Sequence, residues 1–186
     1  TRRFTRRSPD LPGTVDPDRD LAELAEYLGM AQPPAVMECF DISNLSSNHI
    51  VASMVRFTNG RPDNSAYRRY RIKGVDGQND FASMLEVVRR RYSRIVNESS
   101  ALFDKPDEVD LYAWLKELGA EGKAPIKVPD LVVVDGGKGQ LAIAGQVLAE
   151  IGLQHMPVVG LAKRDEEISL PGQSEPLVLS HECGAL

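Results

Sequence analysis

The stretch 130-DLVVVDGGKGQL-141 decides the fold of this chain. An apolar run of four residues ends in Asp135, and a turn with three glycines and Lys138 follows at once. A short, continuous apolar run predicts a strand buried on both faces, as in a parallel sheet. The next segment, 140–152, has the pattern of a helix, and 157-PVVGLA-162 predicts another buried strand. Because a helix joins the two strands, we expect them to be parallel.

The segments before this stretch predict antiparallel strands. Strand-like runs occur at 35-AVMECFDIS-43, 50-IVASMVRFT-58 and 66-AYRRYRIK-73, and the last two resemble a hairpin. Asn59-Gly60 marks a turn between them, although we expect a connection longer than two residues. Residues 166–179, EEISLPGQSEPLVL, predict a final hairpin.

Two further helices are predicted, a short amphipathic one over 18–29 and a longer one over 80–96. One face of the longer helix carries Phe81, Met84, Leu85, Val88, Tyr92 and Ile95. Together these elements predict an α/β fold. It is a mixed sheet of three antiparallel strands and then parallel strands, flanked by helices.

Composition sets the class of protein. Hydrophobic residues make up 42% and charged residues 26% of the 186 residues, which is ordinary for a globular domain and excludes a wholly disordered chain. No apolar run approaches the roughly 20 residues of a membrane span, and the first residues lack the apolar centre of a signal peptide. We therefore expect a cytoplasmic protein without a membrane partner. Cys39 and Cys183 are too few for a disulfide framework or a zinc cluster.

Charge is segregated along the chain. Residues 97–130 hold eight Asp/Glu and four Lys, so they carry −4 of the net charge of −5. We interpret 97–128 as an acidic insertion over the surface, with a short helix at 107–119. Residues 1–16 read as a linker, and 17–186 as one domain.

Asp41 and Asp135 occupy equivalent places, because each closes a strand-like apolar stretch. If the two strands are parallel neighbours, both carboxylates emerge at the same sheet edge. A divalent cation with oxygen ligands, Mg²⁺ or Mn²⁺, would relieve their repulsion and orient water against a phosphodiester. The alternative for Asp135 is a cap on the following helix.

Glycines and cations near Asp135 indicate anion binding. Gly136, Gly137 and Gly139 let a phosphate approach the backbone, the following helix offers free N–H groups, and Lys138 adds a mobile charge. The spacing matches neither a P-loop nor a dinucleotide fingerprint.

Arginines elsewhere are candidates for the same role. Arg68, Arg69 and Arg71, like the arginines within 89–94, either contact phosphates or form a solvated face. Tyr67 and Tyr70 either stack on bases or pack in a strand. His49, His155 and His181 show no metal-site spacing, and we expect the first two at the surface or in turns.

Several motifs in one order resemble a known family. They are ECFDIS (38–43), YRRYRIK (67–73), DFASM (80–84), PDLVVVDGGKGQL (129–141), PVVGLAKRDEEISLPG (157–172) and EPL (175–177). Over roughly residues 18–186, the insertion apart, the chain is similar to the C-terminal endonuclease domain of the UvrC family.

The resemblance implies an RNase H-like fold and a metal-dependent endonuclease that makes the 5′ incision in nucleotide excision repair. The family's two catalytic aspartates correspond to Asp41 and Asp135, and Asp80 matches a further acid in a supporting role or as a helix cap. Gln140 and Lys163 are further candidates for binding nucleic acid. They add to Gly136, Gly137, Lys138, Arg68, Arg69 and Arg71.

The resemblance also implies partners and a missing part. Damaged double-stranded DNA is the expected substrate, and UvrB is expected to bind another part of the full-length protein. The family histidine lies on a helix that we expect beyond Leu186. Asn44 stands where many relatives have His, and the acidic insertion is expected to face away from DNA. Two alternatives remain open: a catalytically silent DNA-binding or scaffold domain, and an RNase H-like nuclease with another nucleic-acid substrate.

Overall fold

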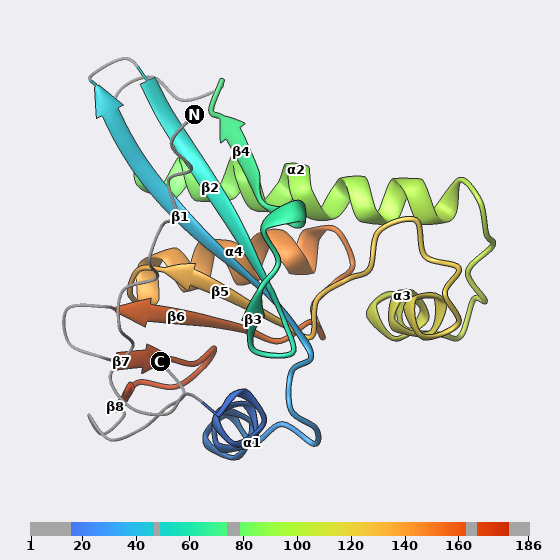
Figure 1. Cartoon of the computed structure of the whole chain (residues 1–186). Coiled ribbons are helices and arrows are strands. Elements are labelled where there is room, and N and C mark those ends of the chain that lie inside the picture. The colour runs from blue at the N-terminus through green and yellow to red at the C-terminus, as the bar shows by residue number, and fades with distance from the viewer. Residues whose placement is uncertain (1–15, 47–48, 74–78, 163–166, 179–186) are drawn as a thin grey trace, which may run out of the picture.

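The computed structural model of the chain describes residues 16–46, 49–73, 79–162 and 167–178 (Figure 1). The helices are α1 (Pro17–Leu28), α2 (Asp80–Ser100), α3 (Leu111–Ala120) and α4 (Lys138–Glu150), with a 3₁₀ turn η1 (Asn64–Ala66). The strands are β1 (Val36–Ser46), β2 (His49–Thr58), β3 (Arg61–Pro62), β4 (Arg68–Arg71), β5 (Leu131–Asp135), β6 (Val158–Ala162), β7 (Glu167–Ser169) and β8 (Leu177–Val178).

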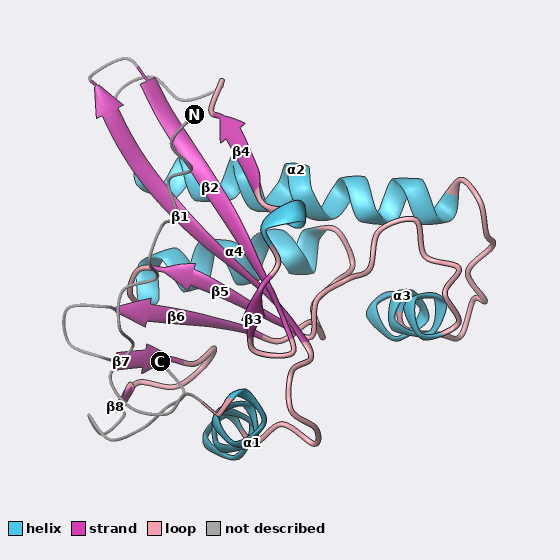
Figure 2. Ribbon diagram, in the orientation of Figure 1, coloured by secondary structure: helices cyan, strands magenta, loops and turns pink. Residues whose placement is uncertain are grey.

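All of these strands belong to one mixed sheet (Figure 2). Its order is β3-β2-β1-β5-β6-β7-β8, and β4 also pairs with β2. The pairs β1–β5 and β5–β6 are parallel, whereas β1–β2, β2–β4, β6–β7 and β7–β8 are antiparallel. The predicted α/β fold and its final hairpin are therefore confirmed.

Helices cover both faces of the sheet, with α2 and α4 side by side on one face and α1 on the other (Figure 1). The larger core lies under α2 and α4, and includes Phe40 of β1 and Val134 of β5. The smaller core lies under α1, where Leu24 meets Leu131 and Val159. None of the described helices has the length and apolarity that a membrane crossing requires.

The Asn59-Gly60 dipeptide makes a tight turn into a short strand that the sequence analysis did not include. Both residues have positive φ, 51° and 69°, and they connect β2 directly to β3. Residue pairs of this kind match the twist of two adjoining strands. The prediction of a longer connection holds only for β4, which η1 separates from β3.

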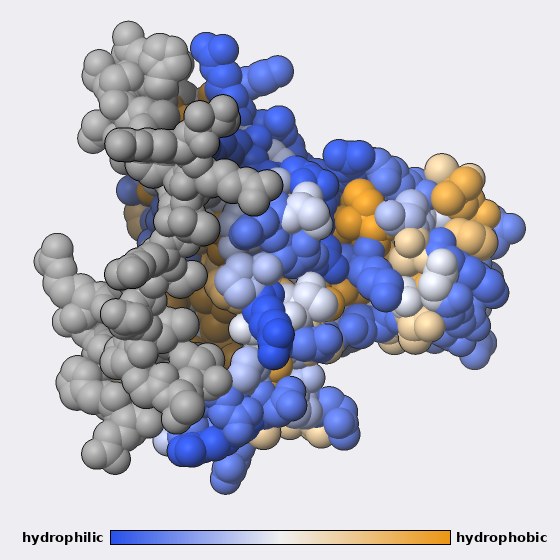
Figure 3. All heavy atoms as spheres, viewed as in Figure 1, coloured by the Kyte–Doolittle hydropathy of each residue, from blue (hydrophilic) through white to orange (hydrophobic). Residues whose placement is uncertain are grey.

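The acidic segment is more than a surface loop. Residues 97–100 complete α2, and α3 follows with Trp114, Leu115 and Leu118 buried in the larger core. The helix lies at the end of the molecule where α2 finishes, far from the carboxyl ends of β5 and β6 (Figure 1). Apolar atoms reach the surface at this same end (Figure 3), where Leu102 is 63% exposed.

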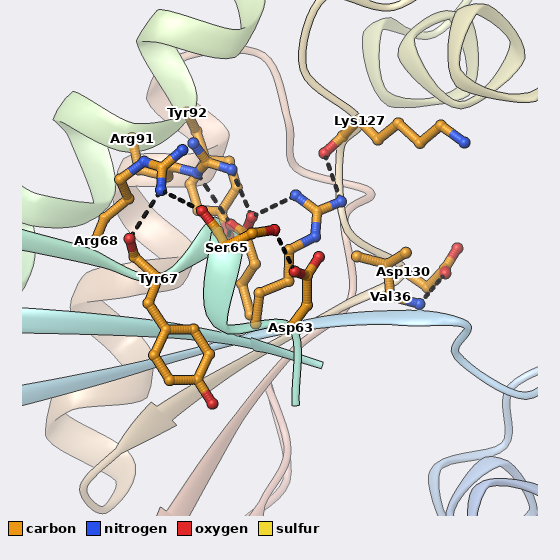
Figure 4. Close-up of polar contacts among 11 residues, drawn as sticks. Val36, Asp63, Ser65, Tyr67, Arg68, Arg91, Tyr92, Lys127 and Asp130 are labelled. Carbon is orange, nitrogen blue, oxygen red and sulfur yellow. Dashed lines mark hydrogen bonds and ion pairs between the residues drawn. The ribbon is translucent and has the colours of Figure 1, made fainter. Parts of the chain in front are cut away.

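A buried ion cluster joins the sheet to α2 (Figure 4). Glu38 of β1 is fully buried, and it accepts hydrogen bonds from Arg56 at 3.2 Å and from Arg91 at 2.6 and 3.2 Å. The hydroxyl of Tyr92 donates to the same carboxylate at 3.0 Å. Arg56 also donates to the carbonyl of Lys127, so the cluster joins β1, β2, α2 and the approach to β5.

Burial and charge act together in this cluster. Burial, aided by the Glu38 charge, raises the pKa of Tyr92 well above its ordinary value, so the hydroxyl remains a donor. The hydrogen bonds and charge of Glu38 outweigh burial and raise the pKa of Arg91. Two guanidinium groups thus depend on one carboxylate in a region closed to water.

We expect Glu38→Ala to lower the free energy of unfolding by about 3–5 kcal/mol, because it leaves two buried cations without a negative charge beside them. Urea denaturation followed by circular dichroism measures the change. Glu98→Ala is the matched control, since its pair with Arg94 is largely exposed, and it should cost about 0.5 kcal/mol or less. Equal losses in the two variants would contradict this account.

Candidate active site

Asp41 and Asp135 lie level with each other on neighbouring parallel strands. The last residue pair of the β1–β5 ladder is Phe40 with Val134, and the two aspartates are the next residues on each strand. Neighbouring strands are about 4.8 Å apart, so side chains at this level that share a face can reach one ion. The two strands are therefore parallel neighbours, which is the condition under which the sequence analysis places both carboxylates at one sheet edge.

One detail of the prediction is wrong, because Asp41 does not end its strand. β1 continues to Ser46 in antiparallel pairing with β2, whereas β5 ends at Asp135. Beyond the two aspartates β1 diverges from β5 (Figure 1). The site therefore lies where one strand leaves its parallel partner, which is where open α/β sheets bind ligands.

Asp130 sets this register from the other end of β5 (Figure 4). Its carboxylate accepts the Val36 amide at 2.8 Å, and its own amide donates to the Val36 carbonyl at 2.7 Å. Lys116 of α3 forms an ion pair with the same carboxylate. The first residues of β1 and β5 are thus held together, which places Asp41 opposite Asp135 five residues later.

Both aspartates face away from α2 and α4. Their neighbours Phe40 and Val134 point into the larger core, and side chains alternate along a strand. Asp41 pairs with Ser53 of β2, which pairs with Arg69 of β4. A hydrogen bond of 2.9 Å from the Ser43 hydroxyl orients one oxygen of Asp41.

The glycine turn packs tightly against β6. A Cβ atom on Gly160 would lie 2.8 Å from the Gly136 carbonyl and 3.5 Å from the Gly137 carbonyl. Gly136 itself has φ of +149°, and a Cβ there would lie 2.2 Å from Cγ of Gln140. Both positions require glycine, whereas Gly137 has open space around it.

The start of α4 is uncapped, unlike the starts of the other helices described. Asp16, Asn79 and Asp110 accept a first-turn amide of α1, α2 and α3 with their side chains. At α4 the cap position is held by Gly137, with no side-chain hydrogen bond. Amide donors at the start of α4 therefore remain suited to an anion.

The cap residues show that neither Asp135 nor Asp80 is an N-cap, which the sequence left open. Asp135 is not the N-cap of α4, because Gly137 holds that position. Asp80 is not the N-cap of α2, because Asn79 caps it at 3.0 Å through the Ala82 amide. Asp80 lies in the first helical turn, where a negative charge is favourable.

Lys138 and Gln140 do not project freely from the turn. The ammonium group of Lys138 donates to the Ser174 carbonyl, which joins the turn to the β7–β8 connection. Gln140 folds back over Gly136, and its Oε1 is buried without a hydrogen-bond partner. Lys163, the other lysine predicted to bind nucleic acid, lies outside the described residues.

The arginines of β4 divide between the two faces of the sheet. Arg69 and Arg71 pair with Ser53 and Val51, so they share the face of Asp41. Arg68 pairs with Met54 of the larger core, and its guanidinium donates to the carbonyls of Ser65 and Tyr67 (Figure 4). Of the three β4 arginines, Arg69 and Arg71 could therefore contact a ligand bound over the aspartates, whereas Arg68 could not.

Among the arginines of α2, Arg91 has a role that neither sequence alternative described, whereas Arg89, Arg90 and Arg94 form ion pairs on an exposed face, as the solvated-face alternative predicts. Arg91 is buried on Glu38, Arg89 pairs with Glu150, and Arg90 lies over the ring of Tyr70 at 5.5 Å. The Tyr70 ring therefore packs against Arg90, as one of its two sequence alternatives predicts.

The sequence analysis missed Glu38. The one signal for its role was a charged residue inside an apolar strand-like run.

His155 is the one histidine whose side chain lies within the described residues. His155 is exposed and meets Asp110 at 2.7 Å, which holds the pKa of that carboxyl below its usual value. The side chains of His49 and His181 lie outside the described part of the chain.

The donors at the site suit a hard cation. Within the described ranges no three Asp, Glu, His or Cys side chains gather closely enough to form a metal cluster. Magnesium, however, is commonly held by one or two carboxylates, with waters and substrate phosphates completing its shell. Two level aspartates beside an uncapped helix start meet that requirement.

A comparison with protein families shows which family has this mixed sheet. The family described as "UvrC RNAse H endonuclease domain" matches residues 25–186. The chain belongs to that family, as the sequence motifs predicted.

Individual relatives are named UvrABC system protein C. The UvrABC system protein C of Thermobifida fusca is 46% identical over 163 residues, covering 86% of this chain and 24% of the relative. That of Methanospirillum hungatei is 42% identical over 165 residues, covering 89% and 26%. The chain thus spans about a quarter of the length of these curated relatives.

Among solved structures, the chain is similar to Endonuclease V of Ciona intestinalis in complex with a 24mer DNA containing an inosine followed by a ribo-adenosine. The TM-score is 0.37 at 10% identity, over 68% of this chain and 45% of that one.

We expect Gly160→Ala to destabilise the protein by about 1–3 kcal/mol, because the added methyl group overlaps the carbonyl of Gly136. Gly145→Ala is the control, since nothing lies within 4 Å of its added methyl group inside α4. That change should stabilise by up to about 1 kcal/mol. Urea unfolding measures both, and opposite signs are required.

Proposed function

We propose that this chain is a divalent-metal-dependent DNA endonuclease domain that makes the 5′ incision of nucleotide excision repair. The observation that supports the proposal most is the level placement of Asp41 and Asp135 on parallel strands, at the point where β1 leaves β5. Family membership supports the nuclease class. The metal and the strand that is cut are inferred from the site's chemistry and the resemblance.

Asp41 and Asp135 would hold Mg²⁺ or Mn²⁺ through their carboxylate oxygens. When bound, such an ion acidifies a water and neutralises charge on a phosphodiester. Ser43 fixes the direction of the Asp41 carboxylate through its hydroxyl. Asp80 acts from the first turn of α2 in a supporting role.

The remaining groups bind and align the DNA strand. Amide groups at the uncapped start of α4 donate hydrogen bonds to a phosphate, and the glycines at 136 and 137 keep side chains out of its way. Arg69 and Arg71 lie on the same sheet face as Asp41 and bind neighbouring phosphates. Lys138 joins them when it leaves the Ser174 carbonyl.

The biological setting extends beyond this chain. We infer that the substrate is damaged double-stranded DNA and that UvrB binds another part of the full-length protein. Residues 1–16 serve as a linker to the domain, and 97–128 as an insertion turned away from DNA. The position of α3, at the opposite end from the aspartates, supports the last point.

A second candidate function is a catalytically silent DNA-binding domain of the same fold. It is favoured by the presence of only two carboxylates level at the site, with no third ligand beside them in the described ranges. The two functions differ in whether the aspartates bind metal and support cleavage.

Asp41→Asn and Asp135→Asn should each reduce DNA cleavage at least about a hundredfold, because a neutral amide loses several kcal/mol of metal-borne stabilisation. Cleavage of a lesion-bearing duplex by the full-length protein with UvrB present measures the rate, and filter binding measures affinity, which should stay near the wild-type value. Asp107→Asn in the insertion is the control. Full activity in both site variants would exclude the proposed mechanism. The cleavage rates of the lesion-bearing duplex, a Holliday junction and an RNA–DNA hybrid are then compared to identify the substrate class.

Manganese should raise the unfolding temperature of the wild-type chain, since a ligand that binds only the folded state stabilises it. At 100 times the dissociation constant the gain is about 2.7 kcal/mol. Asp41→Asn should abolish the shift, whereas Asp107→Asn should retain it. The silent domain predicts no shift in any of the three, as read by differential scanning calorimetry.

A further inference from the structure

Phe81 is an aromatic residue that the helical pattern places on the apolar face of α2 and the structure leaves at the surface. Its partners on the predicted apolar face of α2, Met84 and Val88, are fully buried. Phe81 itself is 52% exposed, and it is absent from both hydrophobic clusters of the described chain. Phe81 therefore shares the apolar face of the predicted helix without being buried there.

The ring lies against the glycine turn of the candidate site. A Cβ atom on Gly139 would lie 2.7 Å from Cε1 and 3.0 Å from Cζ of Phe81, so the ring fills the space of the missing side chain. One side of the ring is thus supported by the first turn of α4. Half of the residue remains open to solvent, next to Asp80 and close to the uncapped helix start.

This location specifies what the ring can bind. Amide groups at the start of α4 are suited to a phosphate, and a base attached to the adjoining sugar would reach the neighbouring surface. An exposed aromatic ring offers a stacking partner to any base whose own face is uncovered. Bases within an intact duplex are covered by their neighbours, whereas unpaired bases near a distortion are not.

We propose that Phe81 stacks on an unpaired base of the DNA strand held at the glycine turn, and so favours DNA that is locally unpaired over intact duplex. The proposal rests on the proposed nuclease function and adds a nucleotide-binding residue and a substrate preference to it. Gly139 contributes by leaving room for the ring to lie against α4.

The test compares Phe81→Leu and Phe81→Trp with two controls, in buffer with EDTA so that no DNA is cut. Tyr27→Leu removes an aromatic ring of similar exposure, 40%, on α1. Leu102→Ala alters an exposed apolar residue at the far end of α2. The probes are a fluorescein-labelled duplex with a bubble of unpaired thymines and the fully paired duplex, and anisotropy gives the affinity.

We expect Phe81→Leu to weaken binding of the bubble duplex by about 5- to 150-fold, with little change for the paired duplex. Both controls should bind as the wild type does, and thermal unfolding of each variant confirms that it is folded. Phe81→Trp should retain binding. Its added indole emission should be quenched by an unlabelled bubble duplex, whereas the chain's single tryptophan, Trp114, is buried and supplies a constant background.

Two results would overturn the stacking role. One is normal binding of the bubble duplex by Phe81→Leu, and the other is unchanged emission of Phe81→Trp at saturation. Either result, together with loss of cleavage in Asp41→Asn, leaves the nuclease function standing. If the wild-type chain binds neither probe, both proposals fall.

Discussion

The buried carboxylate of Glu38 is the constraint on which the arrangement of this domain depends. It meets two guanidinium groups and a tyrosine hydroxyl in a region without water, so α2 can dock on the sheet only where Arg91 and Tyr92 reach it. Since α2 begins at Asp80, that docking also sets where the helix start lies relative to β5 and α4. A structural ion cluster thereby determines the geometry of the candidate site.

The site itself follows from how β1 is shared between two partners. Its first half pairs with β5 in parallel, and its whole length pairs with β2 in the opposite direction. Asp130 aligns the start of the parallel ladder, so the two acidic residues at its end come level without a loop to position them. Groups held by strands in this way are fixed more firmly than groups on loops.

Much of the fold was predictable, because apolar runs and helical period report burial directly. The parallel strands followed from that pattern, and so did the position of Asp41 and Asp135 directly after an apolar run on each strand. Glu38 and Arg91 could not be assigned, because each looks like an ordinary charged residue until its partner, 53 positions away, is known. The exposure of Phe81 was not predictable for a related reason, since the helical period indicates which face a residue is on but not where the neighbouring element stops. The division of the β4 arginines between two faces required a register that sequence alone does not give.

The acidic segment around α3 has a consequence for how the domain approaches its substrate. Its net charge of −4 lies at one end of the molecule, whereas the aspartate site and the exposed Arg69 and Arg71 lie toward the other. In the field of a polyanion this separation exerts a torque that turns the acidic end outward. The domain would then arrive already rotated into its working orientation, and that advantage would fade as salt shortens the range of the field.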